Sequence, residues 1–181
     1  MFLGDSLTAG LGLPSDQSFP SLIGKKIKER GLDYEIVNAG VSGDTSAGGV
    51  RRVDWSLDGD VRVLIVALGA NDGLRGLATR EMKKNLAVIL DRAKERNVPV
   101  ILAGMEAPPN NGPEYTRDFR NVYSEIAAEY KVPLIPFLLQ GVAGDASLNQ
   151  GDGIHPNARG AQIVADLVWK ELEPILRRPT L

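Results

Sequence analysis

The 181-residue sequence contains no cysteine and only one histidine, His155. The absence of cysteine excludes disulfide bonds, thiolate metal sites and a cysteine nucleophile, and it is compatible with either redox compartment. A single histidine without H-x-H or H-E-x-x-H spacing disfavours a histidine-based metal centre. The sequence therefore calls for no metal ion and no other cofactor.

Two kinds of segment are also missing from the chain. There is no run of lysine or arginine and the net charge is −2, so nothing favours binding to nucleic acid or to an anionic membrane. No apolar stretch approaches the roughly 18 residues that a transmembrane helix needs. With 43% hydrophobic and 24% charged residues, the composition is that of a globular protein. We expect one domain over residues 1–181, a small-molecule substrate, and a monomer or weak oligomer.

The hydrophobic pattern alternates between strands and helices along the whole chain. Strands are predicted at residues 1–3, 34–38, 61–68, 98–105 and 134–137. Helices are predicted at residues 18–30, 50–57, 79–96, 116–130 and from 156 or 157 to about 177. Connections of this length join parallel strands through right-handed crossovers, so we predict an α/β fold with about five parallel strands and helices on both faces. Residues 1–3 are few for a buried central strand, and we expect the natural chain to begin earlier.

Four loops with distinctive polar residues are predicted to meet at one edge of the sheet. Gly4-Asp5-Ser6 follows the first strand, Gly43 follows the second, and Gly69-Ala70-Asn71-Asp72 follows the third. Parallel strands all end on the same side, which is where ligands bind in open α/β sheets. Residues 152–155 precede the last helix, which begins at that edge if it packs antiparallel to the strands. The four loops should therefore line one cleft.

The residue types in these loops suit hydrolysis of an acyl compound through a serine. The Ser6 hydroxyl is a poor nucleophile unless a base removes its proton, and His155 is the one available imidazole. Asp152, three residues earlier, can fix the tautomer of that imidazole and stabilise its charged form. An oxyanion would need donors already in place, and the backbone N–H groups of Ser6 and Gly43 and the side-chain amide of Asn71 are candidates.

Other residues near these loops have more modest predicted roles. Asp5 and Asp72 are expected to accept backbone hydrogen bonds that shape their loops, and Asp44 is expected to be a loop or helix N-cap residue. Ser18 is the expected N-cap of the first long helix. An acyl-binding pocket could be lined by Leu74, Leu77, Pro108, Pro109 and Tyr115.

Four blocks of the sequence together carry a family resemblance. They are Gly4-Asp5-Ser6-Leu7, residues 38–45, Gly69-Ala70-Asn71-Asp72 and Asp152-Gly153-Ile154-His155-Pro156. In this order they resemble the SGNH (GDSL) hydrolase superfamily, and the resemblance spans nearly the whole chain. Residues 42–49 and 71–76 are similar to the branch that holds bacterial arylesterases and thioesterase I/lysophospholipase enzymes.

The resemblance implies a flavodoxin-like three-layer α/β/α sandwich with strand order 2-1-3-4-5. It implies Ser6 as nucleophile, His155 as base, Asp152 as the orienting acid, and Ser6, Gly43 and Asn71 as oxyanion donors. The implied substrates are aryl or acyl esters, thioesters and lysophospholipids, with sugar acetates as an alternative. It also implies a periplasmic or secreted protein whose signal has been removed, with a cytoplasmic location left open.

Two other classes of function remain as alternatives. A metal-dependent phosphoesterase could use Asp5, Asp72, Asp152 and His155, although one histidine disfavours it. A non-catalytic binding module could hold an anion on the backbone N–H groups of residues 4–10. Such a module would have no need of the Asp152–His155 pair, so we expect a serine hydrolase.

Overall fold

The computed structural model describes residues 1–177, which form a sheet of five parallel strands with helices on both faces. The sheet order is β2-β1-β3-β4-β5, which confirms the order that the resemblance implied. The strands are β1 (Phe2–Gly4), β2 (Asn38–Gly40), β3 (Leu64–Ala67), β4 (Val100–Ala103) and β5 (Leu134–Ile135).

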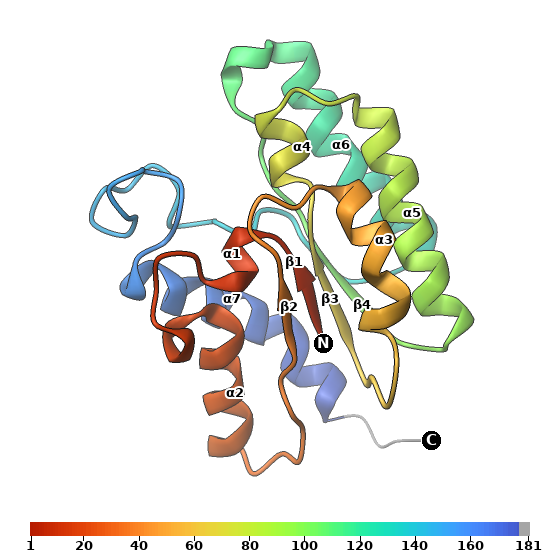
Figure 1. The fold of residues 1–181 in the computed structure, drawn as a ribbon, viewed down its shortest axis with the longest axis vertical. Coiled ribbons are helices and arrows are strands. Elements are labelled where there is room, and N and C mark those ends of the chain that lie inside the picture. Colours follow the sequence, from red (N-terminus) through yellow and green to blue (C-terminus); the bar gives the residue numbers. More distant parts are fainter. Residues whose placement is uncertain (178–181) are drawn as a thin grey trace.

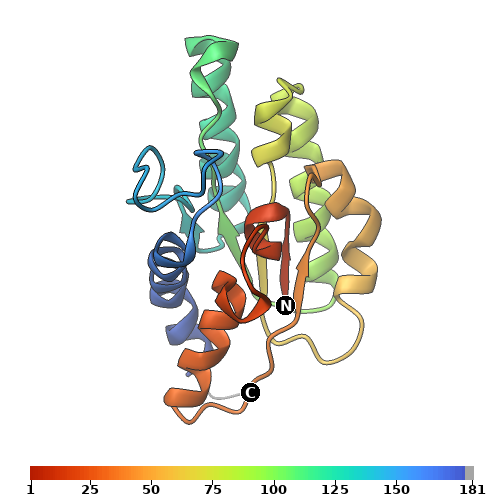
Figure 2. The ribbon, with the colours of Figure 1, turned by 60° about the vertical axis from the view of Figure 1, so that its left-hand side comes forward.

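Helices cover the two faces of the sheet in separate groups (Figures 1 and 2). Helices α2 and α7 pack against each other on one face, and α3, α5 and α6 pack side by side on the other. Their bounds are α2 (Phe19–Glu29), α3 (Ser46–Ser56), α5 (Thr79–Glu95), α6 (Pro113–Tyr130) and α7 (Ala158–Leu176). Two short helices, α1 (Ser6–Ala9) and α4 (Ala70–Leu74), follow β1 and β3 at the carboxyl edge. Within residues 1–177, no helix is both long and apolar enough to cross a membrane.

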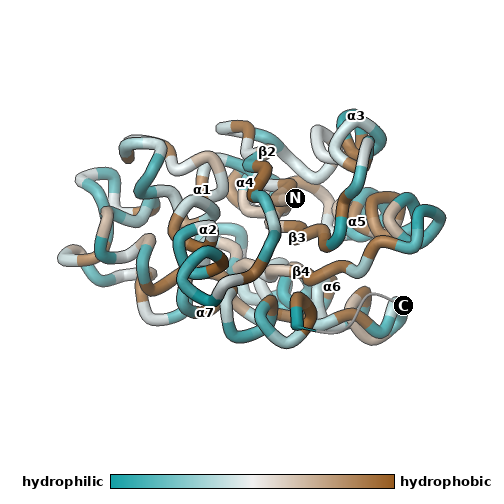
Figure 3. Tube along the Cα trace, turned by 90° about the horizontal axis from the view of Figure 1, so that it is seen from below, coloured by the Kyte–Doolittle hydropathy of each residue, from teal (hydrophilic) through white to brown (hydrophobic). Residues whose placement is uncertain are grey.

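The core lies where the helices meet the sheet. All four residues of β3 and all four of β4 are buried, because both faces of these strands are covered. Figure 3 shows apolar segments along β3 and β4, with hydrophilic segments on the outer helices. Helix α5 buries Met82, Leu86, Ile89, Leu90 and Ala93, which is the helical spacing predicted from the sequence. Each fully buried Leu, Ile or Met side chain contributes about 1.5–3 kcal/mol to folding.

The second strand lies later in the chain than predicted. The sequence placed it at residues 34–38, whereas β2 spans Asn38–Gly40 and pairs with Phe2–Gly4 of β1. Apolar and β-branched residues mark 34–37, but the ladder forms only where a partner strand lies alongside. The peptide N–H of Phe2 donates to the carbonyl of Val37 at 2.9 Å, at the start of this pairing. The position of β2 is therefore set by its pairing with β1, which is distant in sequence.

Helix α3 begins at Ser46, four residues before the predicted start. Thr45 caps it, because its hydroxyl accepts the N–H of Gly48 at 3.4 Å. Gly48 and Gly49 disfavour a helix by propensity. However, a Cβ on Gly49 would lie 2.3 Å from Leu68 Cδ1, so close packing requires glycine there. Ser18 caps α2 as predicted, by accepting the N–H of Ser21.

Candidate active site

Ser6 lies at the tight turn between β1 and α1. Strand β1 ends at Gly4, and Asp5 caps α1 by accepting the N–H of Leu7 at 3.0 Å. A Cβ at Gly4 would lie 1.9 Å from Thr8 Oγ1 and 2.9 Å from the carbonyl oxygen of Ala67, so only glycine fits. Ser6 is the first residue of α1 and lies just after the carboxyl end of β1, an interior strand of the sheet.

His155 lies near the end of a loop that leads into α7. Asn149 and Pro156 pair as an antiparallel bridge, and the N–H of Gln150 donates to the carbonyl of His155 at 2.7 Å. Asn157 caps α7 by accepting the N–H groups of Arg159 and Gly160. Loop 148–157 is thus folded back on itself, and it presents His155 at the carboxyl edge of the sheet.

Ser6, His155 and Asp152 form a continuous chain of hydrogen bonds. Ser6 Oγ lies 2.9 Å from His155 Nε2, and His155 Nδ1 lies 2.7 Å from Asp152 Oδ2. When Nδ1 carries the proton and donates it to Asp152, Nε2 can accept the hydroxyl proton of Ser6. Loops 149 residues apart in sequence therefore meet with the spacing that nucleophile activation needs.

The carboxylate of Asp152 is held in its ionised form. The hydrogen bond from the His155 side chain, with those from the N–H groups of His155 and Ile154, lowers the pKa of Asp152 to about 2. Both N–H groups donate to Oδ1 at 3.0 Å, which leaves Oδ2 for the imidazole. Asp152 can therefore stabilise a positive charge on His155 at neutral pH.

The three predicted oxyanion donors lie around the ends of β1, β2 and β3. Gly43 is the third residue of a turn that the N–H of Asp44 closes on the carbonyl of Val41 at 3.0 Å. Its φ of 79° is the positive value that a type II turn requires, which favours glycine. Asn71, in α4, donates its amide to the carbonyl of Asp44 at 2.9 Å and lies 3.4 Å from Asp5 Oδ2. Asn71 thus contacts the loop that carries Gly43.

A pocket of about 310 Å³ opens beside Ser6 and His155. Its lining includes Ser6, Asn71 and His155, and most of the other side chains are apolar. These apolar residues include Leu74, Met105, Pro108, Phe137, Leu139 and Ile154. A largely apolar pocket with a few polar groups at one side is the usual form of a small-molecule site.

Not every predicted pocket residue lies in this lining. Leu74 and Pro108 do, whereas Leu77, Pro109 and Tyr115 are outside the described lining. Tyr115 stacks on Phe119 and donates its hydroxyl to the carbonyl of Leu77 at 2.8 Å, so these two residues hold the α4–α5 connection instead. Pro109 begins a short 3₁₀ turn. Gly43 is also outside the lining, and its carbonyl accepts from Arg75 at 2.7 Å.

The remaining acidic residues are occupied in shaping the site. Asp72 is buried and accepts the N–H and the hydroxyl of Ser46 at 2.8 and 2.6 Å, which ties α4 to the start of α3. Burial raises the pKa of Asp5 to about 6, against the lowering effect of the Leu7 N–H and the charge of His155. In residues 1–177, no three His, Asp or Glu side chains converge as a metal-binding group.

Two residues that support the site were not found from the sequence. Gln150 Nε2 donates to the carbonyls of Leu11 and Pro156 at 2.7 and 3.0 Å, which holds the histidine loop against the loop after α1. Arg52, in α3, bonds to the carbonyls of Gly4 in β1 and Ala39 in β2 and to the carboxylate of Asp44. Most of the partners of Gln150 and Arg52 are backbone carbonyls, which leave no spacing signal in a sequence.

Comparison with known proteins identifies the family of this chain. The model of the GDSL-like Lipase/Acylhydrolase family matches residues 2–163. The chain belongs to this family. The following relatives are similar to this chain over most of their own length.

Esterase TesA of Pseudomonas aeruginosa is 42% identical over 97% of this chain and 88% of its own length. Thioesterase 1/protease 1/lysophospholipase L1 of Escherichia coli (strain K12) is 36% identical over 97% of this chain and 84% of its own. The crystal structure of a psychrotrophic esterase from Pseudoalteromonas sp., inhibited by monoethylphosphonate, superposes with a TM-score of 0.92. The two sequences are 31% identical, and the superposition covers 98% of this chain and 97% of the esterase chain.

Proposed function

We propose that this protein is a serine hydrolase that cleaves carboxylic esters through an acyl-enzyme on Ser6. The observation that carries the proposal is the chain of hydrogen bonds from Ser6 through His155 to Asp152 at the side of an apolar pocket. Membership of the GDSL-like Lipase/Acylhydrolase family supports the same reaction class.

In the proposed first half-reaction, Ser6 Oγ attacks the ester carbonyl carbon while His155 Nε2 takes the hydroxyl proton. Asp152 stabilises the imidazolium through Nδ1. The tetrahedral intermediate then collapses, its bond to the leaving oxygen breaks, and His155 returns the proton to that oxygen. The acyl group is left on Ser6. In the second half, His155 takes a proton from water, the hydroxide oxygen attacks the acyl carbon, and Ser6 recovers its proton as the acid departs.

The oxyanion of each intermediate is proposed to accept from the N–H of Ser6, the N–H of Gly43 and the amide of Asn71. The hydrogen bond that closes the turn at residues 41–44 comes from the N–H of Asp44 and not from the N–H of Gly43. The N–H of Gly43 can therefore donate to another acceptor. An asparagine amide has two hydrogens, and one of them is committed to the carbonyl of Asp44. The second makes only a 3.4 Å contact with Asp5, and a developing negative charge offers it a better acceptor.

The substrate is proposed to be a small acyl ester or thioester whose acyl chain enters the 310 Å³ pocket. The apolar lining favours a hydrocarbon chain, and no cofactor is needed for the chemistry. The names of two relatives, an esterase and a thioesterase/lysophospholipase, support this class of substrate.

Hydrolysis of p-nitrophenyl esters from acetyl to palmitoyl, by wild type and Ser6→Ala, tests the proposal. We expect wild type to hydrolyse the shorter esters and the variant to lose about 10⁴- to 10⁶-fold in kcat. The rate should fall once the acyl chain exceeds what the pocket holds. Equal hydrolysis by the two proteins would overturn the assignment of Ser6.

A further inference from the structure

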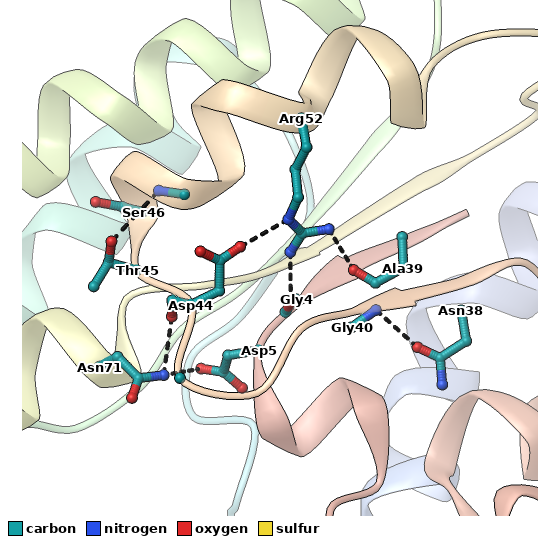
Figure 4. A network of polar contacts seen from close by, with 12 residues as sticks. Gly4, Asp5, Asn38, Ala39, Gly40, Asp44, Thr45, Ser46, Arg52 and Asn71 are labelled. Atoms are coloured by element: carbon teal, nitrogen blue, oxygen red, sulfur yellow. Dashed lines mark hydrogen bonds and ion pairs between the residues drawn. The ribbon is translucent and has the colours of Figure 1, made fainter.

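The side chain of Arg52 connects three segments that border the active site (Figure 4). Its Nε donates to Asp44 Oδ2 at 2.7 Å, its Nη2 donates to the carbonyl of Gly4 at 2.7 Å, and its Nη1 donates to the carbonyl of Ala39. The side chains of Arg52 and Asp44 are 18% and 10% exposed, so this ion pair is largely shielded from water.

Two of these partners lie in short strands that lead into the loops carrying Ser6 and Gly43. Gly4 is the last residue of β1 and precedes Asp5-Ser6, and Ala39 lies in β2 just before the turn that carries Gly43. The carbonyl of Gly4 also accepts the N–H of Val41 at 3.0 Å. The guanidinium therefore holds the end of β1, and with it the start of α1, in a fixed position relative to the 41–44 turn.

The third partner, Asp44, links Arg52 to both of the other proposed oxyanion donors. The N–H of Asp44 closes the turn that orients Gly43, and its carbonyl accepts the amide of Asn71 at 2.9 Å. A Cβ on Gly48 would lie 1.5 Å from Asp44 Oδ1, so the absence of a side chain there leaves room for the carboxylate. By holding the Asp44 side chain, Arg52 therefore also holds the Asp44 backbone, which closes the turn containing Gly43 and accepts the amide of Asn71.

We propose that Arg52 is a positioning residue for the oxyanion hole. It acts through Asp44 and through the ends of β1 and β2, and it holds the N–H of Ser6, the N–H of Gly43 and the amide of Asn71 in register with one another. This inference rests on the proposed function, in which those three groups stabilise the oxyanion. Lysine cannot replace Arg52 fully, because a compact ammonium does not match three acceptors spread around a planar guanidinium.

The test compares Arg52→Met and Arg52→Lys with Arg51→Met, a control at the exposed neighbouring arginine. Active sites are first counted by stoichiometric labelling with a fluorophosphonate, so that kcat refers to folded, reactive enzyme only. We expect Arg52→Met to lower kcat per titrated site by about 10- to 100-fold with KM changed less than about threefold, because donor displacement weakens transition-state contacts most. Arg52→Lys should be intermediate, and Arg51→Met should match wild type.

A second readout separates positioning from simple loss of stability. A trifluoromethyl ketone adds reversibly to the serine oxygen and forms an oxyanion, so its Ki should rise in Arg52→Met by the same factor as kcat falls. A variant that is merely less stable would melt at a lower temperature but keep kcat and Ki per titrated site. That result would overturn the inference.

Two further comparisons keep the outcome decisive. If Arg52→Met does not fold, Asp44→Asn and Arg52→Lys replace it in the test. Asp44→Asn is suitable because it keeps the side-chain shape and the backbone carbonyl. Unchanged kcat in both variants would overturn the inference. Ser6→Ala distinguishes the two levels of the proposal. An inactive Ser6→Ala beside a fully active Arg52→Met would overturn the role of Arg52 alone, whereas an active Ser6→Ala would overturn the proposed function and this inference with it.

Discussion

The pocket beside Ser6 has two sides that are built differently. On the sheet side, Ser6, Gly43 and Asn71 lie at or near the carboxyl ends of β1, β2 and β3. On the loop side, His155 lies in loop 148–157. On the sheet side, Asp5 is 1% exposed and Ser6 is 9% exposed, whereas Asn71 is half-buried and Gly43 is exposed. On the loop side, the Asp152 side chain is 45% exposed. The comparison teaches that the proposed oxyanion donors share their supports with the folded core, while the proposed base depends on hydrogen bonds within and around one loop.

The acidic residues on the two sides show the same difference. Burial raises the pKa of Asp5 to about 6, because few groups on the sheet side compensate for the loss of water. Hydrogen bonds lower the pKa of Asp152 to about 2 on the loop side. Substitutions on the sheet side should therefore change activity and stability together, and those on the loop side should change activity with little effect on stability.

The largest expected effect on activity comes from replacing His155 on the loop side. His155→Ala should lower kcat/KM by about 10⁴-fold or more, because no other imidazole can activate Ser6. The free energy of unfolding should change by no more than about 2 kcal/mol, the scale of the two hydrogen bonds that the His155 side chain makes. Ester kinetics and urea unfolding of the same preparation measure the two quantities. A variant that loses stability in proportion to activity would contradict the separation of the two sides.

The next effect concerns the pH dependence of stability on the sheet side. The pKa of Asp5 is about 6 in the folded protein, and that of an unfolded aspartate is about 4. The folded state therefore binds more protons between these values, so this stabilisation is complete below about pH 4 and is lost as the pH rises through about 6. The expected loss is about 3 kcal/mol, from roughly two pKa units at 1.36 kcal/mol each.

Urea unfolding of wild type and Asp5→Asn from about pH 4 to 7 checks this prediction, since asparagine keeps the N-cap but does not titrate. Asp152→Asn is the matched control. The lowered pKa of Asp152 gives a stabilisation that is present above about pH 4 and lost toward about pH 2, outside the tested window. Parallel curves for wild type and Asp5→Asn would show that Asp5 does not titrate as described.

The smallest effect is expected from loosening the loop side without removing a catalytic group. Gln150→Ala removes the donors to the carbonyls of Leu11 and Pro156 but leaves the bond from the N–H of residue 150 to His155. We expect kcat to fall by about 10-fold, because the base is less well placed. Amide hydrogen exchange should quicken in residues 150–157 and stay unchanged in residues 41–45.

Gln162→Ala is the control for that experiment, because Gln162 is exposed on α7 and bonds only to Asp166 among its described neighbours. It should leave both kcat and exchange as in wild type. Faster exchange in residues 41–45 of Gln150→Ala would mean that the two sides are not supported independently.

The fold was predictable where the hydrophobic pattern is long and regular. The buried run around β3 and the helical spacing of α5 both appear as predicted. Helices α1 and α4 were missed because four or five residues are too few to show a helical period. Strand β2 was misplaced because its register is set by pairing with β1.

The site was predictable to the extent that chemistry alone demanded particular residues. One serine, one histidine and a nearby aspartate could be named because nucleophile activation needs all three types. Arg52 and Gln150 could not, since each bonds to a backbone carbonyl of a segment far away in sequence, Gly4 for Arg52 and Leu11 for Gln150. Pocket residues were the least predictable, because adjacent loop positions such as Pro108 and Pro109 face different surroundings.

Mass spectrometry of enzyme quenched in acid during turnover of a p-nitrophenyl ester is the most direct test of the central claim. The account predicts that the peptide containing Ser6 gains the mass of the acyl group, and that Ser6→Ala gains none and does not hydrolyse the ester. Turnover by Ser6→Ala at the wild-type rate, or an acyl group attached to a different residue, would contradict it.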